Sequence, residues 1–169
     1  MTKSRMLNVV VLSLLVAIAG GLAGGGTAAV AAPSIASSST TSVSYSGTVQ
    51  GRPEDVYLSG LVQISTVVVT DPDFGTAPKV IVSIDFSNVT GQGLKTGTRY
   101  VAGGNQVLTR PFANPDVVKV VFPFYARGTN GTTGARSALA TFTLSYDTAT
   151  LTSSGASASA IVDTPLVAE

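Results

Sequence analysis

The sequence predicts an all-β fold, namely a single antiparallel β-sandwich of about eight strands, with a small β-barrel as the alternative. Three observations lead to this prediction. Beyond residue 42, apolar residues recur at every second position, which is the period of a half-buried strand. Clusters of Gly, Pro, Asn and Asp interrupt these segments at the spacing typical of sandwiches and barrels. No segment beyond the N-terminal region has the apolar period of an amphipathic helix.

Residues 1–31 have the three parts of a secretory signal peptide. Lys3 and Arg5 precede a strongly apolar run, and small residues follow this run as far as Ala31. Because signal peptidase accepts only small side chains next to the scissile bond, we expect cleavage after Ala31, with Ala32 as the second choice. The richness of the segment in Ala and Gly is typical of a bacterial signal.

An uncleaved membrane anchor is the alternative for this region, because no charged residue occurs between Arg5 and Arg52. The strongly apolar run covers only residues 7–19, whereas a membrane-spanning helix needs about 20 apolar residues. We therefore favour cleavage, with no stable membrane span afterwards. The protein is expected to be exported to the periplasm, the cell surface or the medium.

The chain that remains divides into a leader, one domain and a tail. Residues 32–42 are uncharged and rich in Ser and Thr, without any period, which predicts a flexible leader. Residues 43–163 carry the alternating pattern and form the predicted β-sandwich domain. Residues 164–169 are expected to be a loose C-terminal tail.

The strongest pattern in the domain is a pair of strands at residues 56–70 and 79–89. Both are rich in Val and Ile, and they flank a turn that contains Pro and Gly. A strand as long as the first would span about 50 Å, which is more than most strands reach. We therefore expect a bend or bulge near Gly60 or Ser65, with the two halves of the strand serving different sheets.

The other predicted strands lie on both sides of this pair. The alternating pattern places them at residues 43–49, 99–102, 106–110, 117–125, 138–146 and 156–162. Pro123 cannot donate a hydrogen bond to a ladder, so its strand is predicted to lie at an edge or to contain a bulge. Such an open edge would allow a protein partner or a second copy of the chain to add a strand.

The composition excludes several chemistries. The chain has no Cys, no His and no Trp, so thiol nucleophiles, disulfides, thiolate metal sites and a histidine base are all absent. We therefore expect no catalytic residues, no cofactor and no enzyme activity. The formal charge of the whole chain is +1 and is close to neutral once Lys3 and Arg5 are removed. No basic face is expected, and nucleic acid is not an expected partner.

Three Asp residues are the carboxylates that we consider as site candidates. Asp71 and Asp73 are separated by one residue in the sequence Asp-Pro-Asp-Phe-Gly, where they could supply oxygen ligands to Ca²⁺, although the residues are also those of an ordinary turn. Asp85 lies in the middle of a predicted strand, where a rigid scaffold could orient it. The alternative for Asp85 is a solvated or salt-bridged carboxylate on the polar face.

Aromatic residues are the remaining candidates for a ligand groove or a protein interface. Phe122, Phe124 and Tyr125 are close together in one strand, although core packing is the usual role of such residues. Asn88 and Asn130 each begin an Asn-X-Thr glycosylation sequence, which matters only in a host that glycosylates.

No motif in the chain is specific for one biochemical function. The main expectation is an exported, non-enzymatic β-sandwich that serves as a binding or surface-structural module. A small β-barrel that binds an apolar ligand is the first alternative, and it would need an apolar cavity in place of a filled core. A carboxylate-based hydrolase and a calcium-dependent module are the further alternatives, and both depend on the Asp candidates.

Overall fold

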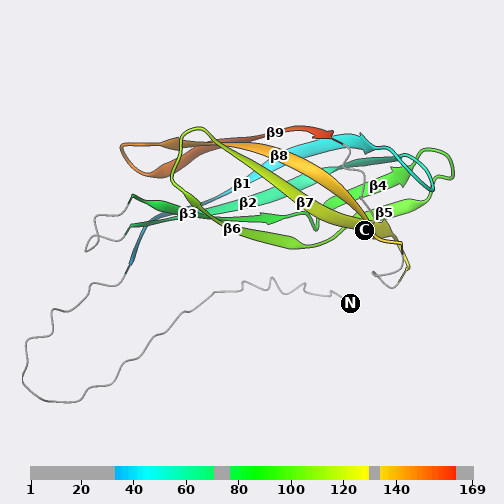
Figure 1. Cartoon of the computed structure of the whole chain (residues 1–169), viewed down its shortest axis with the longest axis horizontal. Coiled ribbons are helices and arrows are strands. Elements are labelled where there is room, and N and C mark those ends of the chain that lie inside the picture. Colours follow the sequence, from blue (N-terminus) through cyan, green and yellow to red (C-terminus); the bar gives the residue numbers. More distant parts are fainter. Residues whose placement is uncertain (1–32, 71–76, 130–133, 163–169) are drawn as a thin grey trace, which may run out of the picture.

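The computed structural model describes residues 33–70, 77–129 and 134–162, and in these ranges the protein consists of strands, turns and loops without a helix. The prediction of an all-β fold is confirmed. Figure 1 shows an elongated molecule in which the strands run along the long axis or obliquely to it. The strands are β1 (Ser34–Val49), β2 (Val56–Thr70), β3 (Lys79–Asp85), β4 (Val89–Gly93), β5 (Arg99–Ala102), β6 (Asn105–Pro111), β7 (Asp116–Ala126), β8 (Arg136–Asp147) and β9 (Thr152–Val162).

Four predictions fall on residues beyond the described ranges. They concern the signal peptide with its cleavage after Ala31, the metal candidates Asp71 and Asp73, the glycosylation sequence at Asn130, and the tail at residues 164–169. All of them stay predictions.

The strands form one antiparallel sheet that folds over on itself. Its order is β6-β3-β2-β4-β5-β7-β8-β9, and β1 pairs with β2 in addition. The strands β7 and β8 cross the direction of β3 and β6 in Figure 1, so two layers face each other with the core between them. The sheet is not closed into a barrel, because no strand ladder joins β1 to β9 in the described chain. The predicted sandwich is therefore confirmed over its barrel alternative.

Strand β2 is the strand on which the sheet divides. One edge of β2 pairs with β1 from Val56 to Thr70, without a bulge in β2 itself. Its other edge pairs with β4 as far as Gly60 and with β3 from Gln63 onward. The bend expected near Gly60 is thus a change of partner: the two halves of β2 serve different branches of the sheet.

Gly60 is required where the two branches separate. A Cβ atom at this position would lie 2.2 Å from the carbonyl oxygen of Asn88 and 2.7 Å from the Cα atom of Val89. Real Cβ atoms do not approach other heavy atoms so closely, so the absence of a side chain lets the turn between β3 and β4 pack against β2.

The prediction of a flexible leader at residues 32–42 is wrong from Ser34 onward, because this segment is the first half of β1. Its backbone pairs with β2, and its hydroxyls pair across the two strands. The Ser39 hydroxyl lies 2.9 Å from that of Thr66, and the Thr40 hydroxyl lies 2.9 Å from that of Ser65. The sequence did not reveal this strand because Ser and Thr hydroxyls occur on both of its faces, so apolar and polar residues do not alternate along it. The segment is ordered because it pairs with the neighbouring strand β2.

The core is built from the inward faces of both layers and contains a cluster of aromatic rings. Phe86 and Phe122 stack with their ring centroids 4.0 Å apart, and the ring of Tyr45 meets Phe122 edge-on at 5.7 Å. Phe122 and Phe124 are fully buried. Their prediction as ligand or interface residues is therefore wrong: a side chain in the filled core cannot contact a partner on the surface.

Strand β7 is paired along one edge only over most of its length. It pairs with β8 from Asp116 to Phe124, but with β5 only from Phe124 to Ala126. The Pro123 carbonyl accepts a hydrogen bond from the Gly103 N–H at 3.0 Å on the side away from β8. The N and C=O groups of one residue point to the same side of a strand. The backbone nitrogen of Pro123 therefore faces away from β8, so the β7–β8 ladder loses no hydrogen bond through the missing N–H. Strand addition by a partner at this edge stays a prediction.

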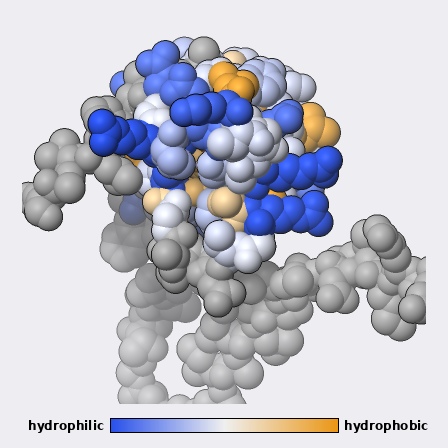
Figure 2. Space-filling view, turned by 90° about the vertical axis from the view of Figure 1, so that its right-hand side faces the viewer, coloured by the Kyte–Doolittle hydropathy of each residue, from blue (hydrophilic) through white to orange (hydrophobic). Residues whose placement is uncertain are grey.

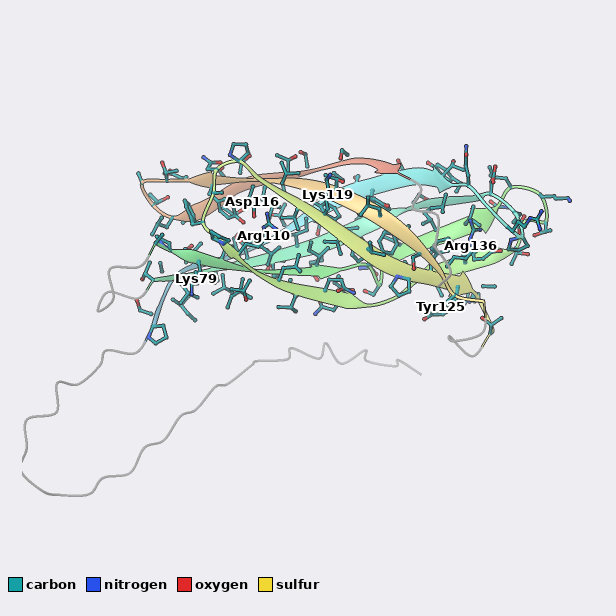
Figure 3. All side chains as sticks on the ribbon, viewed as in Figure 1. Lys79, Arg110, Asp116, Lys119, Tyr125 and Arg136 are labelled. Carbon is teal, nitrogen blue, oxygen red and sulfur yellow. The ribbon has the colours of Figure 1, made fainter. Side chains whose placement is uncertain are left out.

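An ion pair with a buried carboxylate joins the two layers beside this edge. Asp116 at the start of β7 is buried, and Arg110 of β6 binds it through two contacts, Nε to Oδ2 at 2.8 Å and Nη2 to Oδ1 at 2.7 Å. The Asp116 carboxylate raises the pKa of Arg110 by accepting these hydrogen bonds. Figure 3 shows the two labelled side chains between the ribbons of β6 and β7.

The substitution Gly60→Ala is expected to destabilise the protein by about 1–3 kcal/mol, because the added methyl group has to displace backbone atoms of the neighbouring turn. Urea unfolding measures this change. Gly155→Ala is the matched control, since Gly155 also lies in a strand but has no atom within 4 Å of an added Cβ. A loss of stability as large in the control as in Gly60→Ala would refute the explanation.

The substitution Tyr45→Phe is expected to stabilise the protein by about 1 kcal/mol. The Tyr45 hydroxyl is buried and has no hydrogen-bond partner, so its removal relieves an uncompensated loss of hydration. Tyr100→Phe is the contrasting variant and should destabilise, because the Tyr100 hydroxyl lies 3.4 Å from a Glu54 carboxylate oxygen. A lower urea midpoint for Tyr45→Phe would contradict this account.

Candidate functional site

One end of the sandwich collects positive charge. We call it the basic end, and it is formed by the β1–β2 loop, the β4–β5 loop and the neighbouring termini of β7 and β8. Figure 2 views the molecule from this side and shows a mostly hydrophilic surface. Of the ten lysines and arginines in the chain, five lie here: Arg52, Lys95, Arg99, Arg127 and Arg136.

The carboxylates described at this end are both engaged by the backbone. Asp55 accepts a hydrogen bond from the Gly51 N–H at 3.0 Å, and Glu54 binds the loop that contains Lys95 and Thr96. Five cations against these two carboxylates leave positive charge in excess at this end, although the near-neutral net charge of the chain gave no expectation of a basic face. Net charge did not reveal the basic end because its five cations are spread over 85 residues of sequence and meet only in the fold.

Glu54 holds the β4–β5 loop in place from a buried position. Its carboxylate accepts hydrogen bonds from the Lys95 N–H at 3.0 Å, the Thr96 N–H at 2.8 Å and the Thr96 hydroxyl at 2.6 Å. The hydrogen bond from the Thr96 side chain is the largest cause that lowers the pKa of Glu54, followed by the bond from the Thr96 backbone. Gly93 leaves room for the carboxylate, since a Cβ there would lie 2.2 Å from Oε1.

Arg136 fastens the β1–β2 loop at the same end. Its guanidinium donates to the Glu54 carbonyl at 2.7 Å and to the Gln50 carbonyl at 2.9 Å, and it lies 5.1 Å from the centre of the Phe124 ring. These contacts give Arg136 a structural role. Glu54 and Arg136 together fix both loops, so the exposed cations nearby are carried on an ordered scaffold.

A groove of about 390 Å³ lies beside these loops on the outer face of β2, β4 and β5. The strand pairing defines its layout, because directly opposed residues of antiparallel strands lie on the same face. Tyr57 of β2 is opposite Gln92 of β4, and Gln92 is opposite Arg99 of β5. The residues that line the groove are Tyr57, Ser59, Thr90, Gly91, Gln92, Arg99, Tyr100, Val101 and Arg127.

Arg99 and Arg127 lie next to each other at one side of the groove. The Arg127 N–H donates to the Arg99 carbonyl at 2.8 Å, which continues the row of opposed residues onto the chain after β7. Both side chains are exposed. Within the described ranges the single salt bridge is that of Arg110 with Asp116, so neither groove arginine has a carboxylate partner there. Two adjacent guanidiniums without a counter-charge attract an anionic group.

The lining of the groove offers groups that can bind a ligand through hydrogen bonds and charge. Its lining supplies guanidinium, amide, hydroxyl and phenol groups, but it contains no carboxylate, thiol or imidazole that would act as a general base. In the described part of the chain, no three acidic, His or Cys side chains lie close enough together to hold a metal ion. The described residues also include no helix that is long and apolar enough to cross a membrane.

The structure places the remaining sequence candidates away from the groove floor. Asp85 at the end of β3 accepts hydrogen bonds from the Ser87 N–H at 2.8 Å and the Ser87 hydroxyl at 3.0 Å, an arrangement that caps a turn. Tyr125 is half-buried, opposite Val101 and against Gly103, so it borders the groove without being among its lining residues. Asn88 is exposed in the turn between β3 and β4.

The sequence reasoning did not bring the residues that line the groove together as one site. Tyr57, Gln92 and Arg99 occur as single polar or aromatic residues on the outward faces of separate strands, and no local pattern marks them. A signal was present in the alternation itself. Outward positions of a half-buried strand normally carry small polar residues, and a tyrosine and an arginine at such positions are the ones to examine.

No protein-family model, curated protein or solved structure matches this chain. The assignment of function therefore depends on the residues and their geometry.

The substitution Glu54→Gln is expected to destabilise the protein at neutral pH, because an amide cannot accept the three hydrogen bonds from the β4–β5 loop as strongly as a carboxylate. Since folding lowers the pKa of Glu54, its ionisation stabilises the fold above the unfolded pKa of about 4.3, and this contribution is lost as the pH falls through the folded pKa.

Urea unfolding at several pH values tests this prediction. The difference between the wild type and Glu54→Gln should be large at pH 7 and should shrink in acid. Asp55→Asn, which changes the neighbouring exposed carboxylate, should cost less than Glu54→Gln at pH 7. A difference between wild type and Glu54→Gln that stays constant from pH 7 to pH 3 would rule out the carboxylate as the cause.

Proposed function

We propose that the protein is an exported, non-enzymatic β-sandwich that binds an anionic ligand in the groove at its basic end. The observation that carries this proposal is the adjacency of Arg99 and Arg127 beside a groove that contains no acidic residue. Because guanidinium groups bind carboxylate, sulfate and phosphate through paired hydrogen bonds, an anionic group is the ligand chemistry that this pair recognises best.

Two further features support binding as opposed to catalysis. The groove lacks a general base, and the whole chain lacks His and Cys. The strands that carry the groove residues are fixed from within by the Glu54 and Arg136 contacts, which gives the ordered surface that a binding site requires. Export rests on the signal-like sequence of residues 1–31.

The core gives no support to the alternative of an apolar-ligand binder. Such a protein needs an apolar cavity, whereas the interior here is filled by stacked and edge-on aromatic rings. The groove that exists is on the surface and has a polar lining.

The double substitution Arg99→Gln with Arg127→Gln is expected to weaken binding of polyanions at least tenfold. The test is isothermal titration calorimetry of the purified mature protein with polygalacturonate, a sulfated polysaccharide and polyphosphate at low ionic strength, with neutral dextran for comparison. The wild type should bind at least one polyanion, more weakly as salt is added, and should not bind dextran.

The control is the double substitution Lys79→Gln with Lys119→Gln, which removes the same charge. Figure 3 shows both lysines away from Arg136 and the basic end. This control should bind like the wild type. The proposal fails if the wild type binds no polyanion, or if both double variants lose binding equally.

A further inference from the structure

The size of the groove excludes a lone inorganic anion as the ligand that fills it. Its volume of about 390 Å³ falls in the range of sites for small organic ligands, about 300–1,000 Å³. A single phosphate or sulfate would occupy only the neighbourhood of Arg99 and Arg127. The rest of the groove, which reaches Tyr57 on β2, would stay without a contact. The ligand therefore extends across several strands.

The side chains that cross the groove follow a fixed chemical order. An aromatic ring comes first, since Tyr57 is 44% exposed on β2. Next come the amide of Gln92 and the hydroxyl of Thr90 on β4. The guanidiniums of Arg99 and Arg127 close the row. Three strand spacings separate β2 from β7 along this row, which corresponds to about 14 Å.

We propose that the groove binds an acidic saccharide, a stretch of two or three sugar units with a carboxylate or sulfate group; this inference rests on the anion binding proposed above. The apolar C–H face of one sugar ring packs on the exposed ring of Tyr57. Sugar hydroxyls exchange hydrogen bonds with Gln92 and Thr90, both of which have donor and acceptor atoms. The acidic group binds the two guanidiniums.

The order of groups disfavours a single-stranded nucleic acid, which is the other extended anion with flat rings. Nucleic-acid grooves place cations along the strand so that they follow successive phosphates, with aromatic rings between them. Here the cations of the groove are together at one side, and the single exposed ring is at the other. A ligand with one acidic group per two or three units matches this spacing better than one with a charge on every unit.

The test uses oligosaccharides of defined charge in isothermal titration calorimetry. Sialyllactose, which has three sugar units and a single carboxylate, is the probe, and its methyl ester is the neutral probe of the same shape. Polyphosphate and a thymidine oligonucleotide represent the other anions. We expect sialyllactose to bind at least tenfold more tightly than its methyl ester and more tightly than the oligonucleotide.

The substitution Tyr57→Ala separates this inference from simple attraction of anions. It should weaken sialyllactose binding about tenfold and change polyphosphate binding less than twofold, because only the sugar packs on the ring. Tyr57→Phe should retain binding. Leu61→Ala is the matched control, since Leu61 is 52% exposed on the same face of β2 but is not a lining residue of the groove.

Each contrary outcome has a distinct meaning. Binding of polyphosphate that depends on the arginines, without binding of sialyllactose, would overturn the saccharide and leave the anion site. Tighter binding of the oligonucleotide, or equal binding of the methyl ester, would also overturn it. If no anion binds, both the saccharide and the anion site are refuted.

Discussion

The fold depends on the division of strand β2 between two partners on one edge. The first five residues of β2 pair with β4 and the later ones with β3, while its opposite edge pairs with β1 throughout. This arrangement creates two branches, β3–β6 and β4–β5–β7–β8–β9, from a single strand. Gly60 stands at the division, and the chain between β3 and β4 fits there only because no Cβ is present. The sandwich is thus one sheet that a local close contact divides into two layers.

The two branches are held together by polar contacts at sites far apart in the structure. Beside the open edge of β7, the ion pair of Arg110 with the buried Asp116 joins one branch to the other. At the basic end, Arg136 of β8 binds carbonyls of the β1–β2 loop, and Glu54 binds the β4–β5 loop. Because each buried carboxylate is satisfied by several donors, these contacts give the layers a defined relative position. The groove is fixed by the same contacts, because the strands that line it begin and end at these loops.

The sequence predicted the parts of the fold that follow from alternation of apolar residues. The pairing of β2 with β3 and most strands after residue 42 were predicted correctly, because their apolar faces are buried. Strand β4 was missed, since the strand expected at residues 79–89 ends at Asp85 and residues 89–93 form a separate strand. The length of β2 predicted a bend or bulge near Gly60 or Ser65, whereas the structure has a change of pairing partner after Gly60. The first half of β1 was missed, since its hydroxyl-rich faces give no apolar signal. Phe122 and Phe124 have the role in core packing that is usual for such residues.

The groove could not be predicted for a different reason. Its members come from β2, β4, β5 and the end of β7, and only the strand order brings them into one row. Local sequence carries no information about which strands become neighbours across a branch point. Charge was misleading in the same way, because a nearly neutral chain can still collect five cations at one end. Such an uneven distribution of charge results from the order of the strands and cannot be read from the composition.

The unpaired edge of β7 affects whether molecules of this protein aggregate at high concentration. Unpaired strand edges act as templates for cross-β fibres. Here the usable stretch is short, because the Arg110 side chain donates to the Val117 carbonyl and Pro123 offers no N–H. The exposed Lys119 lies between them and adds a charge that a growing stack would have to bury. Stacking of many copies into fibres through this edge is therefore disfavoured, whereas a partner or a second copy could still pair with the short stretch between Val117 and Pro123.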